Sequence, residues 1–150
     1  MSPKARWGWP AGITLALLVA DQAAKAWAWQ LAGPLRAGFV AIRPQTNAGG
    51  VFGLFPGGGG TFTVLTGLAC VGILYALARL RPGEKLTRGG LALALGGALG
   101  NLVDRLACGA VRDFIDVGFW PTFNLADAGI TVGAVLLVLA LWRRQQVAEA

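Results

Sequence analysis

The feature that most restricts the fold is a set of four long apolar segments joined by polar connectors. They span residues 7–29, 61–80, 86–105 and 126–142. An α-helix needs about 20 apolar residues to cross the hydrocarbon core of a bilayer. Charged residues make up only 13% of the chain and the mean hydropathy is +0.61, whereas a soluble domain is about 25% charged. We therefore predict an all-α membrane protein with four transmembrane helices in a single domain, residues 1–150.

The basic residues indicate the orientation. They precede the first segment, fill the turn between the second and third, and follow the fourth: Lys4, Arg6, Arg79, Arg81, Lys85, Arg88, Arg143 and Arg144. Lys and Arg concentrate in cytoplasmic loops, so both termini are expected in the cytoplasm of a multi-pass membrane protein. The first loop, 30–60, and the connector, 106–125, are then outside. The net charge of +6 forms no basic stripe beside stacking aromatics, which argues against nucleic-acid binding.

Missing residue types restrict the chemistry. The chain has no histidine, and its one serine is Ser2. Neither a Ser-His-Asp or Cys-His centre nor a His-ligated zinc site can be built from it. Cys70 and Cys108 lie far apart and indicate no disulfide framework. An enzyme of this composition depends on carboxylates, lysine, threonine or Tyr75, and we expect no cofactor or metal.

Polar residues converge near the outer end of the predicted bundle. Between Arg88 and Asp104 lie fifteen residues, about 22 Å of helix against a hydrocarbon core of about 30 Å. The third helix therefore reaches the membrane edge with Asn101, Asp104 and Arg105. By the same argument Asp127 lies at the outer edge of the fourth.

Stripes of small residues continue into these polar groups. On the third segment the stripe comprises Gly90, Ala94, Gly97, Asn101 and Asp104, and on the fourth Asp127, Thr131 and Ala134. Small residues let helices approach closely in lipid, so both stripes are predicted to face the bundle. On the first segment Asp21 and Lys25 form an i,i+4 pair whose charges neutralise each other.

Paired carboxylates are the candidate catalytic groups. The connector contains V-R-D-F-I-D, with Asp113 and Asp116, and returns to Asp127. Two carboxylates at a low-dielectric boundary tend to share one proton, which is the state that an aspartic protease uses. Spacing alone does not decide whether Asp113 or Asp116 is the partner of Asp127.

Structural explanations compete with each catalytic assignment. Asp127 has the position of an N-terminal helix cap. Asp104 and Arg105 are adjacent opposite charges that can close a helix, and Asp116 can be a solvated loop charge. Asn47 lies in the glycine-rich stretch TNAGGVFG and suits a turn.

Five motifs together resemble the bacterial lipoprotein signal peptidase (signal peptidase II) family. In order along the chain they are D21-Q-A-A-K25, N47-A-G-G-V-F-G, G100-N-L-V-D-R105, V111-R-D-F114 and F123-N-L-A-D127. The resemblance covers essentially the whole chain. One departure is Gly50-Val51, where the family more often has alanines.

The resemblance implies a membrane aspartic endopeptidase. Such an enzyme removes the signal peptide from a diacylglyceryl-modified prolipoprotein, cutting before the lipidated cysteine. Its partners are that substrate and membrane lipid, it acts as a monomer, and loop 30–60 forms a small β-rich cradle. The implied catalytic pair is Asp113 and Asp127; the implied substrate-binding residues are Asn47, Asn101, Arg105 and Asn124; the implied supporting residues are Asp21, Lys25 and Asp104.

Two other functions fit a small polar-cored membrane protein. An ion-coupled transporter uses intramembrane carboxylates, but usually near the bilayer midplane and within internal repeats. A non-catalytic helper subunit uses polar residues only to hold helices together. Such a helper tolerates Asp-to-Asn changes at 113 and 127, and a peptidase does not.

Overall fold

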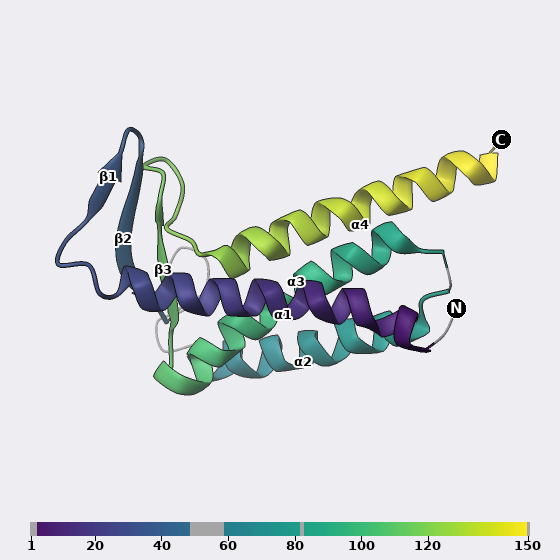
Figure 1. Cartoon of the computed structure of the whole chain (residues 1–150), viewed down its shortest axis with the longest axis horizontal. Helices are drawn as coiled ribbons and strands as arrows, with labels where there is room; N and C mark the ends of the chain where they lie inside the picture. The colour runs from purple at the N-terminus through teal and green to yellow at the C-terminus, as the bar shows by residue number, and fades with distance from the viewer. Residues whose placement is uncertain (1–2, 49–58, 82, 150) are drawn as a thin grey trace.

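The computed structural model describes residues 3–48, 59–81 and 83–149, which form four helices and one small sheet. The helices are α1 (Pro3–Ala28), α2 (Gly59–Arg79), α3 (Lys85–Cys108) and α4 (Leu125–Glu149). The strands are β1 (Leu35–Ala37), β2 (Val40–Asn47) and β3 (Val111–Asp116). The sheet stands at one end of the helices, and α1 begins and α4 ends at the other (Figure 1). The predicted mostly helical, membrane-type architecture with a small sheet is confirmed.

Apolar side chains cover the outside of the helices. In the described part of the chain, α2, α3 and Leu125–Gln146 of α4 are long and apolar enough to cross a membrane. Helix α1 falls below that criterion, since it carries the polar residues Asp21, Gln22 and Lys25. Its outward face is nevertheless apolar, with Leu15 59% and Val19 58% exposed. A surface of this kind suits lipid and not water.

Helix α3 is the centre of the bundle and packs against α1, α2 and α4. Its small residues permit this. A Cβ added at Gly97 would overlap the Ala126 carbonyl oxygen of α4, and one at Gly90 would lie 2.8 Å from the Gly133 carbonyl oxygen. The predicted inward stripe on α3 is therefore confirmed: its glycines set how closely α4 approaches.

The predicted stripe on α4 is wrong in its later positions. Thr131 and Ala134 are exposed. Instead Gly133 packs against the α3 backbone, and a Cβ on Gly129 would overlap the Leu17 side chain of α1. Because glycine allows the closest backbone approach, α4 turns its Gly129–Gly133 edge inward.

Two helices extend beyond their predicted ends. Helix α3 continues past Arg105 to Cys108, where Gly109 adopts the left-handed conformation (φ 73°) and its N–H donates to the Arg105 carbonyl at 3.0 Å. A glycine in this conformation is a common helix terminator. Helix α4 continues past Trp142 to Glu149, because the polar residues there are good helix formers and include no Gly or Pro.

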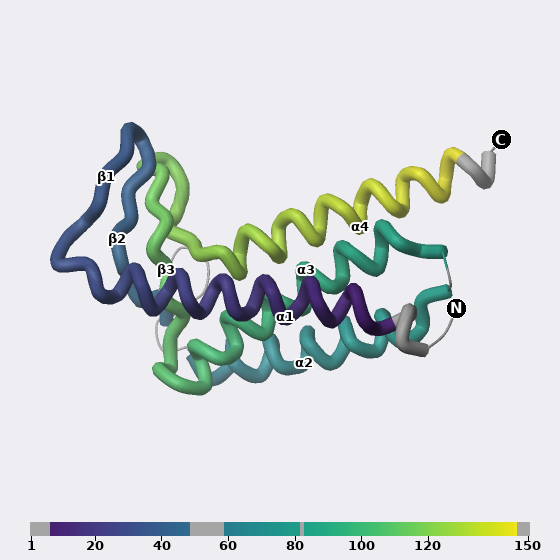
Figure 2. Tube along the Cα trace, viewed as in Figure 1, coloured from purple at the N-terminus to yellow at the C-terminus, as the bar shows by residue number. Residues whose placement is uncertain are grey.

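The sheet is antiparallel in the order β1-β2-β3. Gly38, with φ 63°, makes the tight β1–β2 turn, as hairpins of this length require. The cradle expected within loop 30–60 is only partly correct, because β3 comes from the connector after α3 and lies beside the hairpin (Figure 2). β2 has an irregularity between Ile42 and Gln45, around Pro44, which cannot donate a ladder hydrogen bond. The remainder of TNAGGVFG, from Gly49, lies outside the described residues.

Candidate active site

Two of the candidate carboxylates are joined through amide side chains at the junction of β3 and α4. The Asn124 side chain donates to one oxygen of Asp113 at 2.7 Å, and Asn47 on β2 donates to the other at 3.1 Å. The Asn101 side chain on α3 donates to Asp127 at 2.7 Å. The Asn124 side chain also donates to the Asn101 oxygen at 3.1 Å, so three predicted site residues that are far apart in sequence hold Asp113 and Asp127 in one network.

Asp127 also caps its helix. The N–H of Asp127 donates to the Asn124 side-chain oxygen at 2.9 Å, and the N–H of Asn124 donates back to the Asp127 carboxylate at 3.3 Å. This reciprocal arrangement is a capping box, with aspartate in place of the usual Glu or Gln. The capping explanation is therefore partly correct: Asn124 is the N-cap residue, and Asp127 in the first turn completes the box. This contact occupies one carboxylate oxygen of Asp127, while Asn101 binds the other.

The surroundings of Asp113 favour its protonated form. Its side chain is 3% exposed. Burial, and next the nearby charge of Asp127, raise the pKa of Asp113 from 3.8 to about 6, although the hydrogen bonds from Asn47 and Asn124 oppose the change. A carboxyl group with such a pKa can hold or release a proton near neutral pH, as general acid–base catalysis requires.

Asp116 has different surroundings. Its carboxylate pairs with Arg43 of β2 at 3.4 Å and accepts the N–H of Gly118 at 2.8 Å. It lines one cavity with Asp113 but does not line the cavity that contains Asp127. The geometry therefore pairs Asp113, and not Asp116, with Asp127.

A buried ionic cluster lies directly behind the carboxylate network. Lys25 of α1 contacts Asp21 at 2.7 Å and Asp104 of α3 at 2.9 Å, and all three side chains are fully buried. The Lys25 ammonium also donates to the Asn101 oxygen at 3.2 Å. Asp21 accepts the N–H of Ala126, the second residue of α4, at 2.9 Å. The cluster therefore ties α1, α3 and the start of α4 to the amide that holds Asp127.

Two members of this cluster were not predicted. Arg112 forms an ion pair with Asp104 at 2.7 Å, and its guanidinium donates to the Gln22 side chain at 2.7 Å. Gln22 in turn donates to Asp104 at 3.2 Å. Both lie inside quoted motifs, D-Q-A-A-K and V-R-D-F, next to residues that were singled out. Gln22 and Arg112 lie close together because β3 packs beside α1, and sequence spacing does not predict this packing.

Arg105 faces the carboxylates from α3. Its guanidinium donates to the Thr66 hydroxyl of α2 at 3.2 Å and lies 6.0 Å from the centre of the Phe62 ring. It lines the same cavity as Asp113 and Asp127. This places a half-buried cation in the wall of the cavity that the carboxylates line.

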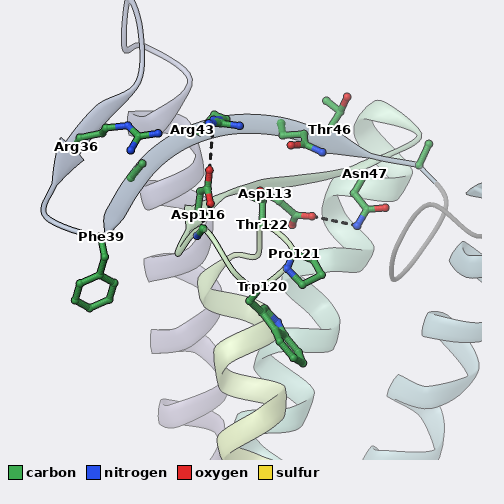
Figure 3. Close-up of a pocket in the computed structure, with 14 residues that line it drawn as sticks. Arg36, Phe39, Arg43, Thr46, Asn47, Asp113, Asp116, Trp120, Pro121 and Thr122 are labelled. Carbon is green, nitrogen blue, oxygen red and sulfur yellow. Dashed lines mark hydrogen bonds and ion pairs between the residues drawn. The ribbon is translucent and has the colours of Figure 1, made fainter.

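Two cavities meet at Asp113. The first, which we call the helix cavity, has a volume of about 360 Å³, and residues of α2, α3 and α4 line it, including Phe62, Asn101, Arg105, Asp127 and Ile130. The second, which we call the sheet pocket, has a volume of about 620 Å³ and lies against β1, β2 and the chain after β3 (Figure 3). Both are lined by Asn47, Asp113, Trp120, Pro121 and Thr122. Asp113 is thus part of the wall of both cavities.

No group of three or more Cys, Asp or Glu side chains that could hold a metal ion occurs among the described residues. The arrangement offers two carboxylates, four nearby amide or guanidinium groups and a cavity that both carboxylates line. That is sufficient for acid–base hydrolysis by water.

Comparison with known proteins agrees with this arrangement. The family described as Signal peptidase (SPase) II matches residues 13–143. A lipoprotein signal peptidase of Paraburkholderia phytofirmans is 42% identical over 89% of this chain and 84% of the relative. Another, of Pelotomaculum thermopropionicum, is 46% identical over 95 residues, 63% of this chain and 62% of the relative. The second match therefore spans less than two thirds of that relative.

Solved structures share the fold. One bacterial membrane enzyme has a TM-score of 0.85 and 26% sequence identity, covering 92% of this chain and 90% of its own. A second has a TM-score of 0.81 and 27% identity, covering 89% and 92%. The predicted family is confirmed: the chain belongs to the signal peptidase II family.

Proposed function

We propose that Asp113 and Asp127 are the catalytic pair with which this member of the signal peptidase II family removes signal peptides from prolipoproteins. The observation that carries the proposal is the shared network: Asn124 bonds to both carboxylates, and both line the helix cavity. The substrate we propose is a diacylglyceryl-modified prolipoprotein, cut before its lipidated cysteine.

The proposed reaction needs only these carboxylates and water. The ionised carboxylate takes a proton from the attacking water, while the protonated one donates to the scissile carbonyl oxygen. The tetrahedral diol then collapses and its C–N bond breaks. The leaving amine takes a proton from the carboxyl group that had deprotonated the water, and the other carboxylate takes a proton back from the diol. Three residues hold the substrate backbone or the carboxylates: Arg105, Asn47 and Asn101. Asn124 aligns Asp113 with Asp127. Asp21, Lys25 and Asp104 support this arrangement from behind.

We propose that all four helices cross the inner membrane, with both termini cytoplasmic and the carboxylates at the outer edge. Support comes from the shared end at which α1 begins and α4 ends (Figure 1) and from the basic residues there, which include Arg143 and Arg144. Apolar residues on the outer face of α1 support its place among the spans despite its buried ionic cluster. We further propose that residues 1–150 form one domain, which acts as a monomer in lipid and binds no nucleic acid.

Membrane placement lowers the barrier by positioning. The apolar part of a signal peptide lies in the bilayer, and the acyl chains hold the cysteine at the outer interface. Confining substrate and enzyme to one plane and one depth supplies part of the entropy that a bimolecular reaction otherwise costs.

Cleavage assays on carboxylate variants test the proposal. Wild type, Asp113→Asn, Asp127→Asn and Asp116→Asn are purified in detergent and given a diacylglyceryl-modified prolipoprotein, with EDTA present and helical content checked. We expect losses of at least about 100-fold for the first two variants, because each removes an acid–base group, and a mild effect for Asp116→Asn. Equal losses at 113 and 116 would reject the pair, and full activity in folded Asp113→Asn would reject Asp113 as a catalytic residue. No cleavage by purified, folded wild type would favour the helper-subunit or transporter alternative.

A further inference from the structure

The two cavities differ in the chemistry of their walls. The helix cavity contains apolar side chains of the spanning helices, such as Phe62 and Ile130. The sheet pocket contains polar and charged side chains: Arg36, Arg43, Gln45, Thr46 and Asp116. Asp113 lies in the wall of both. A chain that crosses the catalytic carboxylates therefore enters one kind of environment before the cut and another after it.

The charge in the sheet pocket is unevenly distributed. Arg43 is paired with Asp116 at 3.4 Å. No ion pair within the described part of the chain involves Arg36, which is exposed on β1. Asp113 and Asn47 lie at one end of the pocket, and Arg36 and Arg43 lie towards the other (Figure 3). The end distant from the carboxylates thus carries an uncompensated positive charge.

Given the proposed function, we propose that the sheet pocket binds the polypeptide directly after the scissile bond, and that Arg36, assisted by Arg43, selects acidic side chains there. The spanning helices receive the apolar signal peptide, so the mature segment is the part of the substrate that leaves the membrane. It is polar and extended, which fits a solvent-open pocket of about 620 Å³ beside a sheet.

The sheet register gives the position of the selected residue. Arg36 pairs with Ala41, and Ala41 pairs with Asp116, so Arg36 lies two strands from Asp116. Strands are about 4.8 Å apart and residues about 3.3 Å apart along a strand, which puts the Cα atoms of Arg36 and Asp113 roughly 14 Å apart. An extended substrate covers this distance in about four residues. Because the Arg36 side chain reaches part of the way, fewer substrate residues can suffice. The selected acids are the second to fifth residues of the mature chain.

Substrate charge series test this inference separately from the proposed function. Three diacylglyceryl-modified prolipoproteins differ only in mature residues two to five, which carry two Glu, two Gln or two Lys. We expect kcat/KM of wild type for the Glu substrate to exceed that for the Lys substrate about two- to fivefold, the range for exposed ion pairs, and the ratio to fall in high salt.

Charge reversal at one position identifies the arginine responsible. Arg36→Glu should reverse the order, so that the Lys substrate is cleaved faster than the Glu substrate. Arg143→Glu, which makes the same charge change on α4 at the opposite end, should keep the wild-type order. Arg43→Gln should reduce the ratio less than Arg36→Glu, since Arg43 is already paired.

The outcomes separate the two ideas. Failure to cleave the Gln substrate rejects the proposed function. Equal cleavage of all three substrates by wild type, or an unchanged order in Arg36→Glu, overturns the selectivity inference and leaves the peptidase intact. If Arg36→Glu lowers all three rates equally, and only on vesicles that contain phosphatidylglycerol, the arginine binds an anionic lipid headgroup and the inference is also overturned.

Discussion

Asp113→Asn should make the stability of the protein less sensitive to pH. The pKa of Asp113 rises from 3.8 to about 6 in the folded protein, chiefly through burial and next through the charge of Asp127. The folded protein therefore binds this proton more tightly than the unfolded chain. The resulting stability is fully present below pH 3.8 and is lost as the pH rises through about 6. The loss amounts to about 3 kcal/mol by pH 8.

Asparagine carries no proton to lose, so the variant lacks this dependence. The variant also lacks the negative charge that Asp113 acquires beside Asp127 as the pH rises. Repulsion between the two carboxylates therefore no longer lowers the stability of the folded protein at high pH. The new amide does cost stability, because its NH₂ group faces a donor from Asn47 or Asn124. That cost is the same at every pH. The useful quantity is therefore the difference in the free energy of unfolding between wild type and variant at pH 8, minus the same difference at pH 4.

Thermal unfolding in detergent measures this quantity. Between pH 4 and pH 8 we expect the Tm of wild type to fall by roughly 5–10 °C more than that of Asp113→Asn. Asp116→Asn, on the same strand, is the matched control and should follow the wild-type profile, since an exposed pair such as Asp116–Arg43 contributes at most about 1 kcal/mol. Parallel pH profiles for wild type and Asp113→Asn would refute the reasoning.

Four further substitutions test the packing and charge arguments. Lys25→Met leaves the buried Asp21 carboxylate without a cation and Asp104 with Arg112 alone, and should destabilise the protein by about 3–5 kcal/mol, seen as a lower Tm; an unchanged Tm would mean that the cluster is not ionised. Gly97→Ala introduces a Cβ that overlaps the Ala126 carbonyl and should lower both Tm and activity, whereas Gly72→Ala on α2, with nothing within 4 Å, should raise stability by up to about 1 kcal/mol. Arg105→Ala should raise KM more than it lowers kcat, and full activity would remove any role in substrate binding.

The helices and the inward stripe on α3 were predictable because their signals are local. Apolar length defines a membrane helix, and the spacing from Gly90 to Asp104 defines one face. The exact ends were less predictable. The third helix was predicted to end at Arg105, whereas it ends at Cys108, because the left-handed conformation of Gly109 terminates it.

The site was predictable in its residues and not in its connections. The motifs named the carboxylates and amides, but spacing left Asp113 and Asp116 equivalent. The distinction comes from β3: there Asp116 meets Arg43 of β2, and Asp113 meets Asn124 at the start of α4. Likewise the pair Gln22 and Arg112 results from packing between α1 and the connector. These are tertiary relationships that no local pattern encodes.

Asn101 shows why amides, and not further charges, stand between the buried cluster and the carboxylate pair. Its oxygen accepts from Lys25 at 3.2 Å and from Asn124 at 3.1 Å, which leaves its NH₂ group to donate to Asp127 at 2.7 Å. The cation therefore fixes which way the amide points, and the amide in turn fixes the Asp127 carboxylate. An aspartate at 101 would be an acceptor only and would repel Asp127. A neutral amide transmits orientation without adding charge, and the pKa of Asp113 stays near 6 through its burial and the charge of Asp127, although the charge of the buried Lys25 acts to lower it.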